Sequence, residues 1–361
     1  MKYISEYRDK KLIDRVARLI EMSVERDYTF MEVCGGHTAA IHRFGIPSLL
    51  PANIKLMSGP GCPVCVTSTG FVDRIIACAQ MDDIIITTFG DLMRVPGSGP
   101  NLEEVKSKGA DVRIVFSGLD ALDIALQNPR KRIIFPGIGF ETTAPGTAVT
   151  IIEAAAKKAV NFFVLSTHKV MPPVMRALLD TGMRIDGFIC PGHVATITGY
   201  SAFEFIPREY NKACVITGFE PLDLLQAILM LVNQVNRNKP SLETEYKRAV
   251  LPEGNTLALE VLSRVFEPCD AEWRGFGIIP LSGLALCREY DKYDAGRLLE
   301  ADFPPGKDNP ACICGDILRG LKRPSECPLF SEICTPANPV GACMVSAEGA
   351  CNSFYKYTLY E

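Results

Sequence analysis

Residues 327–351 read CPLFSEICTPANPVGACMVSAEGAC, and with CICG at residues 312–315 they hold six of the fourteen cysteines. This segment is rich in proline and turn residues, so it cannot bury much apolar surface of its own. Metal binding would supply the missing free energy of folding. The cysteines concerned are Cys312, Cys314, Cys327, Cys334, Cys343 and Cys351. We therefore expect a metal cluster to hold this segment together.

Three kinds of site remain open for these thiols. Zinc sites usually present close CxxC or Cys/His pairs, but Cys312 and Cys314 are the only close pair and no histidine follows residue 193. Iron–sulfur clusters accept more widely spaced thiolates. Six cysteines exceed the four that a cluster needs, which leaves two for a disulfide. We expect an iron–sulfur cluster, with a zinc site and a disulfide-only knot as the alternatives.

A second group of cysteines lies near the start of the chain, in GPGCPVC at residues 59–65. The CxxC spacing of Cys62 and Cys65 places two sulfurs within bonding distance, and such pairs often work as redox dithiols. Half of a zinc site is the alternative, but no second close pair lies nearby in the sequence. We predict a redox dithiol.

The third cysteine motif is CGGHT, at residues 34–38. A cysteine at a strand end, followed by two glycines, predicts an exposed thiol. Cys34 is then a candidate nucleophile with His37 as its base, or a soft ligand for a transition metal. A turn with a buried cysteine is the alternative. His168 and His193 also follow predicted strands, and each is a candidate acid, base or polar anchor.

Composition excludes several classes of function. The net charge is −4 over 361 residues and no basic run occurs, so a nucleic-acid surface is not expected. No apolar run approaches the length of a membrane span, and the N-terminus lacks the pattern of a signal peptide. We therefore expect a cytoplasmic protein. Clustered cysteines in the cytosol favour metal binding or thiol chemistry over structural disulfides.

Short apolar runs alternate with helical segments from residue 30 to about residue 237, which predicts α/β domains with parallel sheets. We predict two such domains in tandem, at residues 28–140 and 141–238, followed by a cysteine-rich iron–sulfur domain at residues 239–361. The N-terminal helix, within residues 1–27, is expected to pack on that third domain. Polar and glycine-rich loops after several strands favour a ligand cleft between the two lobes.

Several of these motifs together resemble one known family. The sequence is similar to the HypD family of NiFe-hydrogenase maturation factors from residue 30 to the C-terminus. The motifs that carry the resemblance are MEVCGGHT, GPGCPVC, FGDLMRVPGS, FETTAP, PGHV, GFEPLD and CPLFSEICTPANPVGACMVSAEGAC.

The resemblance implies a function. Proteins of this family assemble the Fe(CN)2CO unit of NiFe-hydrogenase in the cytosol, with a small HypC-type chaperone and a HypE-type cyanide donor. It also implies two α/β domains and a third domain with a 4Fe–4S cluster. The protein would be a redox-active assembly scaffold rather than a conventional turnover enzyme.

The resemblance also implies roles for individual cysteines. The cluster spacing of the family, C-x14-C-x6-C-x16-C, falls on Cys312, Cys327, Cys334 and Cys351. Cys314 and Cys343 match a disulfide-capable pair near the cluster, and Cys62 and Cys65 match an exchangeable dithiol. Cys34 matches the thiol that holds iron while cyanide and CO are attached, and His37 lies in the same motif.

Two other functions remain as alternatives. One is an iron–sulfur thiol–disulfide reductase that acts on a protein disulfide, using the cluster and the CxxC motif. The other gives the cluster only a structural role in the third domain.

Overall fold

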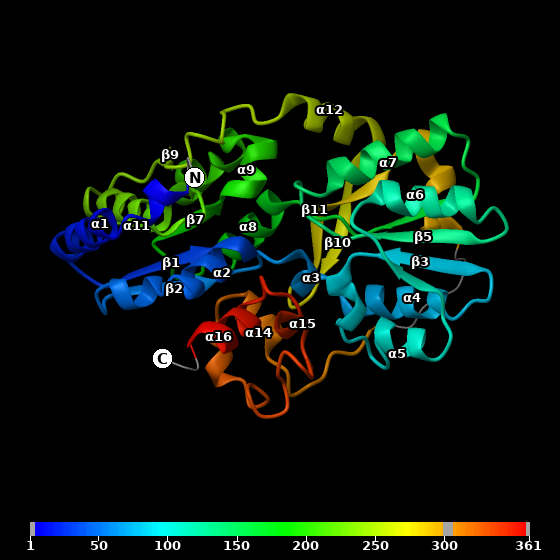
Figure 1. Ribbon diagram of the computed structural model, residues 1–361. Coiled ribbons are helices and arrows are strands. Elements are labelled where there is room, and N and C mark those ends of the chain that lie inside the picture. Colours follow the sequence, from blue (N-terminus) through cyan, green and yellow to red (C-terminus); the bar gives the residue numbers. More distant parts are fainter. Residues whose placement is uncertain (1–3, 299–305, 359–361) are drawn as a thin grey trace.

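The computed structural model describes residues 4–298 and 306–358. It contains two α/β lobes, each built on a parallel sheet, and the cysteine-rich C-terminal segment packs beside both (Figure 1). The predicted α/β class, with two parallel sheets and a separate cysteine-rich segment, is confirmed. The inner strands of each sheet are largely buried because helices cover both of its faces.

The first lobe contains a five-stranded parallel sheet in the order β2-β1-β7-β8-β9. Its strands are β1 (Tyr28–Glu32), β2 (Ile54–Ser58), β7 (Gly187–Pro191), β8 (Ala213–Thr217) and β9 (Leu242–Thr244). One face is covered by α2 (Gly35–Arg43) and α11 (Pro221–Asn236). The other is covered by α8 (Met171–Asp180), α9 (Gly192–Thr198) and α10 (Phe205–Tyr210).

The second lobe contains a four-stranded parallel sheet in the order β4-β3-β5-β6. Its strands are β3 (Ile84–Thr88), β4 (Val112–Ile114), β5 (Arg132–Gly137) and β6 (Phe162–Ser166). On one face lie α4 (Thr69–Ala79) and α5 (Leu102–Ser107). On the other lie α6 (Gly118–Gln127), α7 (Ala144–Ala156), α12 (Thr256–Val265) and the antiparallel hairpin of β10 (Phe266–Trp273) and β11 (Gly277–Leu286).

The lobes are not arranged in tandem, so the predicted boundary at residue 140 is wrong. Strand β1 pairs with β7, placing Phe30 opposite Gly187. The first sheet is therefore built from residues 28–58 and 187–244, and the second sheet, residues 84–166, is inserted between them. An apolar run predicts that a strand exists but does not identify its partner. The tandem prediction depends on consecutive strands being neighbours, which is the common arrangement but does not hold here.

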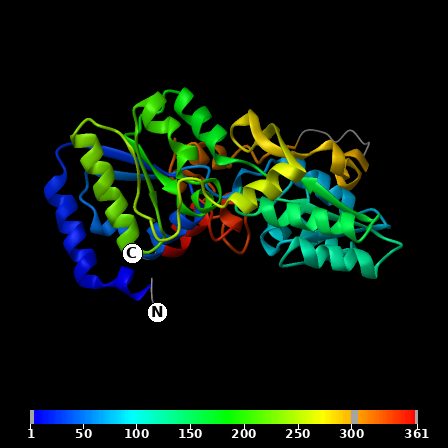
Figure 2. The ribbon, with the colours of Figure 1, turned by 90° about the horizontal axis from the view of Figure 1, so that it is seen from above.

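The N-terminal helix also lies elsewhere than predicted. Helix α1 (Lys10–Ser23) packs along α11 of the first lobe, not on the cysteine-rich segment (Figure 2). Ile20 is fully buried in that contact, and the Asn236 side chain donates to the carbonyl oxygen of Ser23. Residues 1–3, 299–305 and 359–361 of the predicted third domain lie outside the described residues.

The C-terminal segment contacts both lobes. Its helices are α14 (Cys314–Leu318), α15 (Ala342–Val345) and α16 (Ala350–Thr358). Helix α16 packs on α2 of the first lobe. From the second lobe, the Arg94 guanidinium donates to the carbonyl oxygen of Ala337 at 3.0 Å, and the Asp91 carboxylate accepts from the Ser346 hydroxyl at 2.9 Å. The remaining short helices are η1 (Ser5–Arg8), η2 (Ile46–Leu49), α3 (Pro63–Val66), η3 (Gly90–Arg94), η4 (Tyr200–Phe203), η5 (Arg288–Tyr293), α13 (Ala295–Leu298) and η6 (Pro324–Glu326).

Candidate functional site

Cys34 lies between the end of β1 and the first turn of α2, as the N-cap residue of that helix. It is only 8% exposed, so the prediction of an exposed thiol is wrong. Burial, and to a smaller extent the nearby Glu348 carboxylate, raises the pKa of the Cys34 thiol to about 12. The backbone N–H groups of Gly36 and His37 act in the opposite direction, because they stabilise the thiolate at the helix N-terminus.

The GPGC turn packs directly against Cys34. The N–H of Gly35 donates to the carbonyl oxygen of Gly61 at 2.8 Å. The N–H of Gly59 donates to the carbonyl oxygen of Glu32, also at 2.8 Å. A Cβ atom at residue 61 would overlap the backbone nitrogen of Cys34. Only glycine allows this approach. The structure thus brings the CGGHT and GPGCPVC motifs together, although the 20 residues between them give no sequence signal of this contact.

Cys62 and Cys65 form a disulfide at the start of the short helix α3, with their Cα atoms 5.3 Å apart. Cys65 is fully buried and Cys62 is 4% exposed. The Cys65 sulfur lies 3.9 Å from the carbonyl oxygen of Ala342. Since Ala342 directly precedes Cys343, the disulfide faces the cysteine-rich segment.

All six cysteines of the C-terminal segment line one small cavity. Its other lining residues are Ile317, Phe330, Gly341 and Met344, which bring no polar side chain. The cavity volume is about 10 Å³. The Cys314 and Cys343 sulfurs lie 2.6 Å apart in its wall. Six thiols therefore converge on one apolar space.

The side chains around this cavity bear on whether it suits a metal ion or an iron–sulfur cluster. Thiolates are the ligands of iron–sulfur clusters and also suit zinc. Backbone lies close to the sulfurs, since a Cβ atom at Gly341 would come within 2.6 Å of the Cys312 sulfur. Within residues 4–298 and 306–358, no group of three or more His, Cys, Asp or Glu side chains has the arrangement that a single metal ion needs. The donor set, six thiols with no competing polar side chain, has the chemistry that a cluster shared among several thiolates requires.

His37 is buried near Cys34, but its ring is held at the carboxyl end of β8. Its Nε2 donates to the carbonyl oxygens of Thr217 and Gly218, at 3.2 and 3.1 Å. Burial lowers the pKa of His37 to about 3, so the ring is neutral at physiological pH. Its ring stacks on Phe219 at 4.5 Å, and Phe219 stacks on His193 at 3.7 Å. Nδ1 is buried without a hydrogen-bond partner among the described residues.

His168, another histidine predicted to follow a strand, lies away from this site. His168 is fully buried in the second lobe, where its ring nitrogens contact the Thr147 hydroxyl at 2.9 Å and the Gly139 carbonyl at 3.4 Å. Its ring also packs edge-on against Phe266. His168 therefore belongs to the core of that lobe, whereas His193 reaches His37 through Phe219.

Sequence reasoning missed two acidic residues near Cys34. Glu32 is buried and accepts hydrogen bonds from the Cys34 N–H at 3.0 Å and the Thr38 hydroxyl at 2.5 Å. Burial raises the pKa of Glu32 to about 7. Glu348 of the C-terminal segment lies against Gly35. An acid within the otherwise apolar strand YTFME was the available signal for Glu32; nothing in the sequence linked Glu348 to Cys34.

Comparison with known proteins decides the family. The family model HypD, described as the hydrogenase formation hypA family, matches residues 8–358. The chain belongs to the HypD family. It is 48% identical over 368 residues to hydrogenase maturation factor HypD2 of Bradyrhizobium diazoefficiens, covering 99% of this chain and 97% of that one. It is 43% identical over 381 residues to hydrogenase maturation factor HypD of Escherichia coli, covering 100% and 99%.

A further relative is similar over nearly the same length. The putative hydrogenase expression/formation protein of Methanocaldococcus jannaschii is 46% identical over 350 residues, covering 96% of both chains. The chain is thus a hydrogenase maturation factor of this family, as the motifs predicted. In the part of the chain that the structure describes, no helix combines the length and apolar character needed to cross a membrane.

Proposed function

We propose that this protein is a redox-active scaffold on which the Fe(CN)2CO unit of NiFe-hydrogenase is assembled in the cytoplasm. One observation carries the proposal: cysteines from three motifs form a nearly continuous series from Cys34 to the six-thiol cavity. Gly61 touches Cys34, the next residue is half of the Cys62–Cys65 disulfide, and Cys65 faces the residue before Cys343. This series links a candidate iron-binding thiol to a candidate source of electrons.

Cys312, Cys327, Cys334 and Cys351 are the proposed ligands of a 4Fe–4S cluster. When bound, such a cluster supplies electrons one at a time. Cys314 and Cys343 are then the proposed redox pair at the cavity wall, supported by the 2.6 Å between their sulfurs.

The dithiol of Cys314 and Cys343 can reduce the Cys62–Cys65 disulfide by exchange. The Cys343 thiolate attacks the Cys65 sulfur and releases the Cys62 thiolate. Cys314 then attacks the Cys343 sulfur and releases Cys65. Two electrons and the two thiol protons pass to the front pair, and a Cys314–Cys343 disulfide remains. Two electrons, delivered one at a time by an external one-electron donor protein, together with two protons from solvent, must then reduce that disulfide again.

The iron being assembled is the substrate, and Cys34 is its proposed ligand. A soft thiolate suits Fe(II) with cyanide and CO ligands. Because burial keeps the Cys34 thiol protonated, iron must displace the proton, and the amides of the α2 N-terminus stabilise the resulting sulfur charge. We further propose that a HypC-type chaperone shares this iron and that a HypE-type protein donates the cyanide.

Infrared spectroscopy of the anaerobically purified protein, co-expressed with its small chaperone, tests the scaffold. The expected result is bands of bound cyanide and CO together with iron beyond the cluster content. Cys34→Ala should lose both the bands and the additional iron while its cluster iron stays. Wild-type protein without such bands, together with hydrogenase maturation by Cys34→Ala, would refute the proposal.

A thiol–disulfide reductase is the second candidate, favoured by the Cys62–Cys65 disulfide beside the cysteine-rich segment. It predicts that the reduced protein cleaves a partner's disulfide through a mixed disulfide at Cys62 or Cys65. Trapping that species with Cys62→Ser and with Cys65→Ser, in preparations without additional iron, would favour the reductase.

A further inference from the structure

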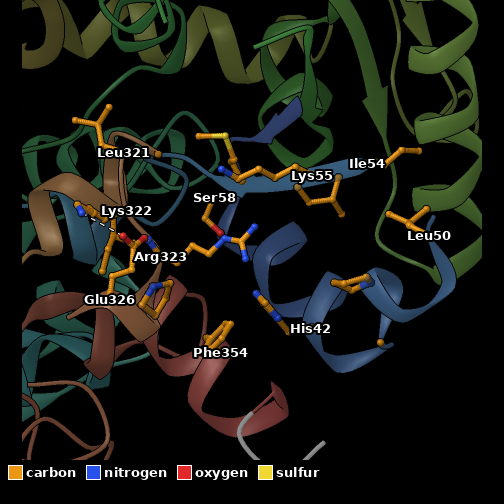
Figure 3. Close-up of a pocket in the computed structure, with 17 residues that line it drawn as sticks. His42, Leu50, Ile54, Lys55, Ser58, Leu321, Lys322, Arg323, Glu326 and Phe354 are labelled. Carbon is orange, nitrogen blue, oxygen red and sulfur yellow. Dashed lines mark hydrogen bonds and ion pairs between the residues drawn. The ribbon is translucent and has the colours of Figure 1, made fainter. Parts of the chain in front are cut away.

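A groove of about 420 Å³ lies between the first lobe and the C-terminal segment, along strand β2 (Figure 3). We call it the β2 groove. Strand β2 is the outermost strand of its sheet and pairs only with β1 among the described strands. All five residues of β2, 54 to 58, line the groove. Because successive side chains point to opposite faces of a sheet, a space that touches all five lies along the open edge.

The register of β2 identifies the backbone groups that face the groove. At one end the Asn53 carbonyl accepts from the Tyr28 N–H, and at the other the Gly59 N–H donates to the Glu32 carbonyl. The odd-numbered residues of β2 therefore form the hydrogen bonds to β1. The even-numbered residues between them direct their backbone N–H and C=O groups away from β1, toward the groove. The Leu56 N–H and C=O are thus positioned to pair with another strand.

The charges around the β2 groove are mostly positive. Lys55, Lys322 and Arg323 line it, and Glu326 is its only carboxylate among the described residues. Glu326 pairs with Lys322 at 3.1 Å. Within the described ranges no carboxylate forms an ion pair with Lys55 or Arg323. Figure 3 shows the Arg323 side chain extending into the space between Ser58 and His42.

The groove also offers apolar surface. Leu321 is 60% exposed at its rim, and Phe354 and Leu56 line its wall. Burial lowers the pKa of His42 to about 4, so this residue adds a neutral ring at physiological pH. An occupant that alternates acidic and apolar side chains would satisfy both the cations and this surface.

We propose that the β2 groove binds an extended, acidic segment of a partner protein, which adds to the sheet as a further strand. A second copy of this chain fits less well, because a two-fold pairing would bring the same cations together. Strand β2 continues into the turn that packs on Cys34. A partner bound here would be held beside that cysteine. The proposal does not depend on which metals the cysteines hold.

The test uses the full-length protein and a fluorescein-labelled peptide, GDLEVDLEG, followed by fluorescence anisotropy. We expect saturable binding that the double variant Lys55→Glu/Arg323→Glu weakens at least about tenfold, which corresponds to about 1.4 kcal/mol. The matched control, Lys108→Glu/Lys157→Glu, makes the same charge change at exposed sites of the second lobe and should bind normally. The charge-reversed peptide GKLKVKLKG should not bind.

Backbone pairing is tested separately from charge. Leu56→Pro removes an N–H that faces the groove and leaves the hydrogen bonds to β1 intact, so it should weaken binding. Circular dichroism checks its fold, and N-methylation of alternate peptide residues gives the same test without altering the protein. Absence of saturable binding, or equal binding by the double variant or by the N-methylated peptide, would overturn the proposal. A concentration-dependent dimer that the double variant abolishes, without peptide binding, would instead assign the groove to a second copy.

Discussion

Gly61 lies so close to Cys34 that a Cβ atom at residue 61 would overlap the Cys34 backbone nitrogen. The N–H of Gly35, the residue after Cys34, also donates to the Gly61 carbonyl oxygen. Two motifs separated in the sequence are thus fixed against each other by backbone alone. The position of the candidate iron-binding thiol depends on the GPGC turn as much as on its own helix.

Gly61→Ala tests this relationship. The added methyl group must push the turn away from Cys34, and overpacking of this kind typically costs about 1–3 kcal/mol of folding free energy. We expect lower stability in urea unfolding and reduced hydrogenase activity in a strain that lacks its own HypD. Gly99→Ala is the control, since nothing lies within 4 Å of a Cβ atom there. Equal activity in both variants would show that the contact is unimportant for maturation.

The front disulfide gives a second prediction. If Cys62 and Cys65 pass electrons to the site at Cys34, the double variant Cys62→Ser/Cys65→Ser should retain its cluster iron but lose hydrogenase maturation. Iron analysis and complementation measure the two properties. Cys78→Ser changes a buried cysteine of the second lobe and should leave maturation intact. Normal maturation by the double variant would favour the alternative in which the cluster is only structural.

Glu141 gives a prediction for pH. Burial raises the pKa of its carboxyl to about 7, although Oε1 accepts from the Met171 N–H at 2.8 Å. At pH values between the unfolded pKa, near 4.3, and the folded pKa, the Glu141 carboxyl is more fully protonated in the folded state than in the unfolded chain. This contribution to stability is therefore complete below the unfolded pKa and is lost as pH rises through the folded one.

Urea unfolding of Glu141→Gln at pH 5 and pH 7 measures this contribution. The decline in stability between these values should be smaller than in the wild type, by roughly 2–3 kcal/mol at most. The pKa values of Glu32 and Glu245 are also raised to about 7. These two residues still contribute to the pH dependence of stability in the variant, so part of the decline remains. The exposed Glu260→Gln should match the wild type. An unchanged decline in Glu141→Gln would contradict the assignment.

Much of the local structure could be predicted from the sequence. The apolar, β-branched run at 84–87 predicted β3, and Glu220-Pro221 predicted the start of α11. Such features depend on neighbours in the sequence, which a pattern records. The pairing of β1 with β7 could not be predicted, because it depends on contacts across more than 150 residues.

The residues of the candidate site could likewise be predicted only in part. Residue types and spacing indicated Cys34, the Cys62–Cys65 pair and the six C-terminal cysteines. The burial of Cys34 was missed because Glu348 and the GPGC turn, both remote in sequence, close around it. His37 was expected to serve Cys34 as a base, yet its Nε2 donates to carbonyl groups at the end of β8. Spacing within a motif does not report which strand lies beside it.

The last prediction concerns the division of the six C-terminal cysteines. Cys327→Ala should lose cluster iron and visible absorbance, because a proposed ligand is removed, and it should unfold at lower urea because cluster binding contributes folding free energy. Cys314→Ala should keep both iron and colour, since the proposed role of Cys314 is to pair with Cys343, whose sulfur lies 2.6 Å away. It should nevertheless lose hydrogenase maturation, because Cys343 without Cys314 cannot supply the two electrons that reduce the Cys62–Cys65 disulfide. Iron content, absorbance and complementation measured on both variants decide the matter: loss of colour in Cys314→Ala with retention in Cys327→Ala would require a different set of four ligands.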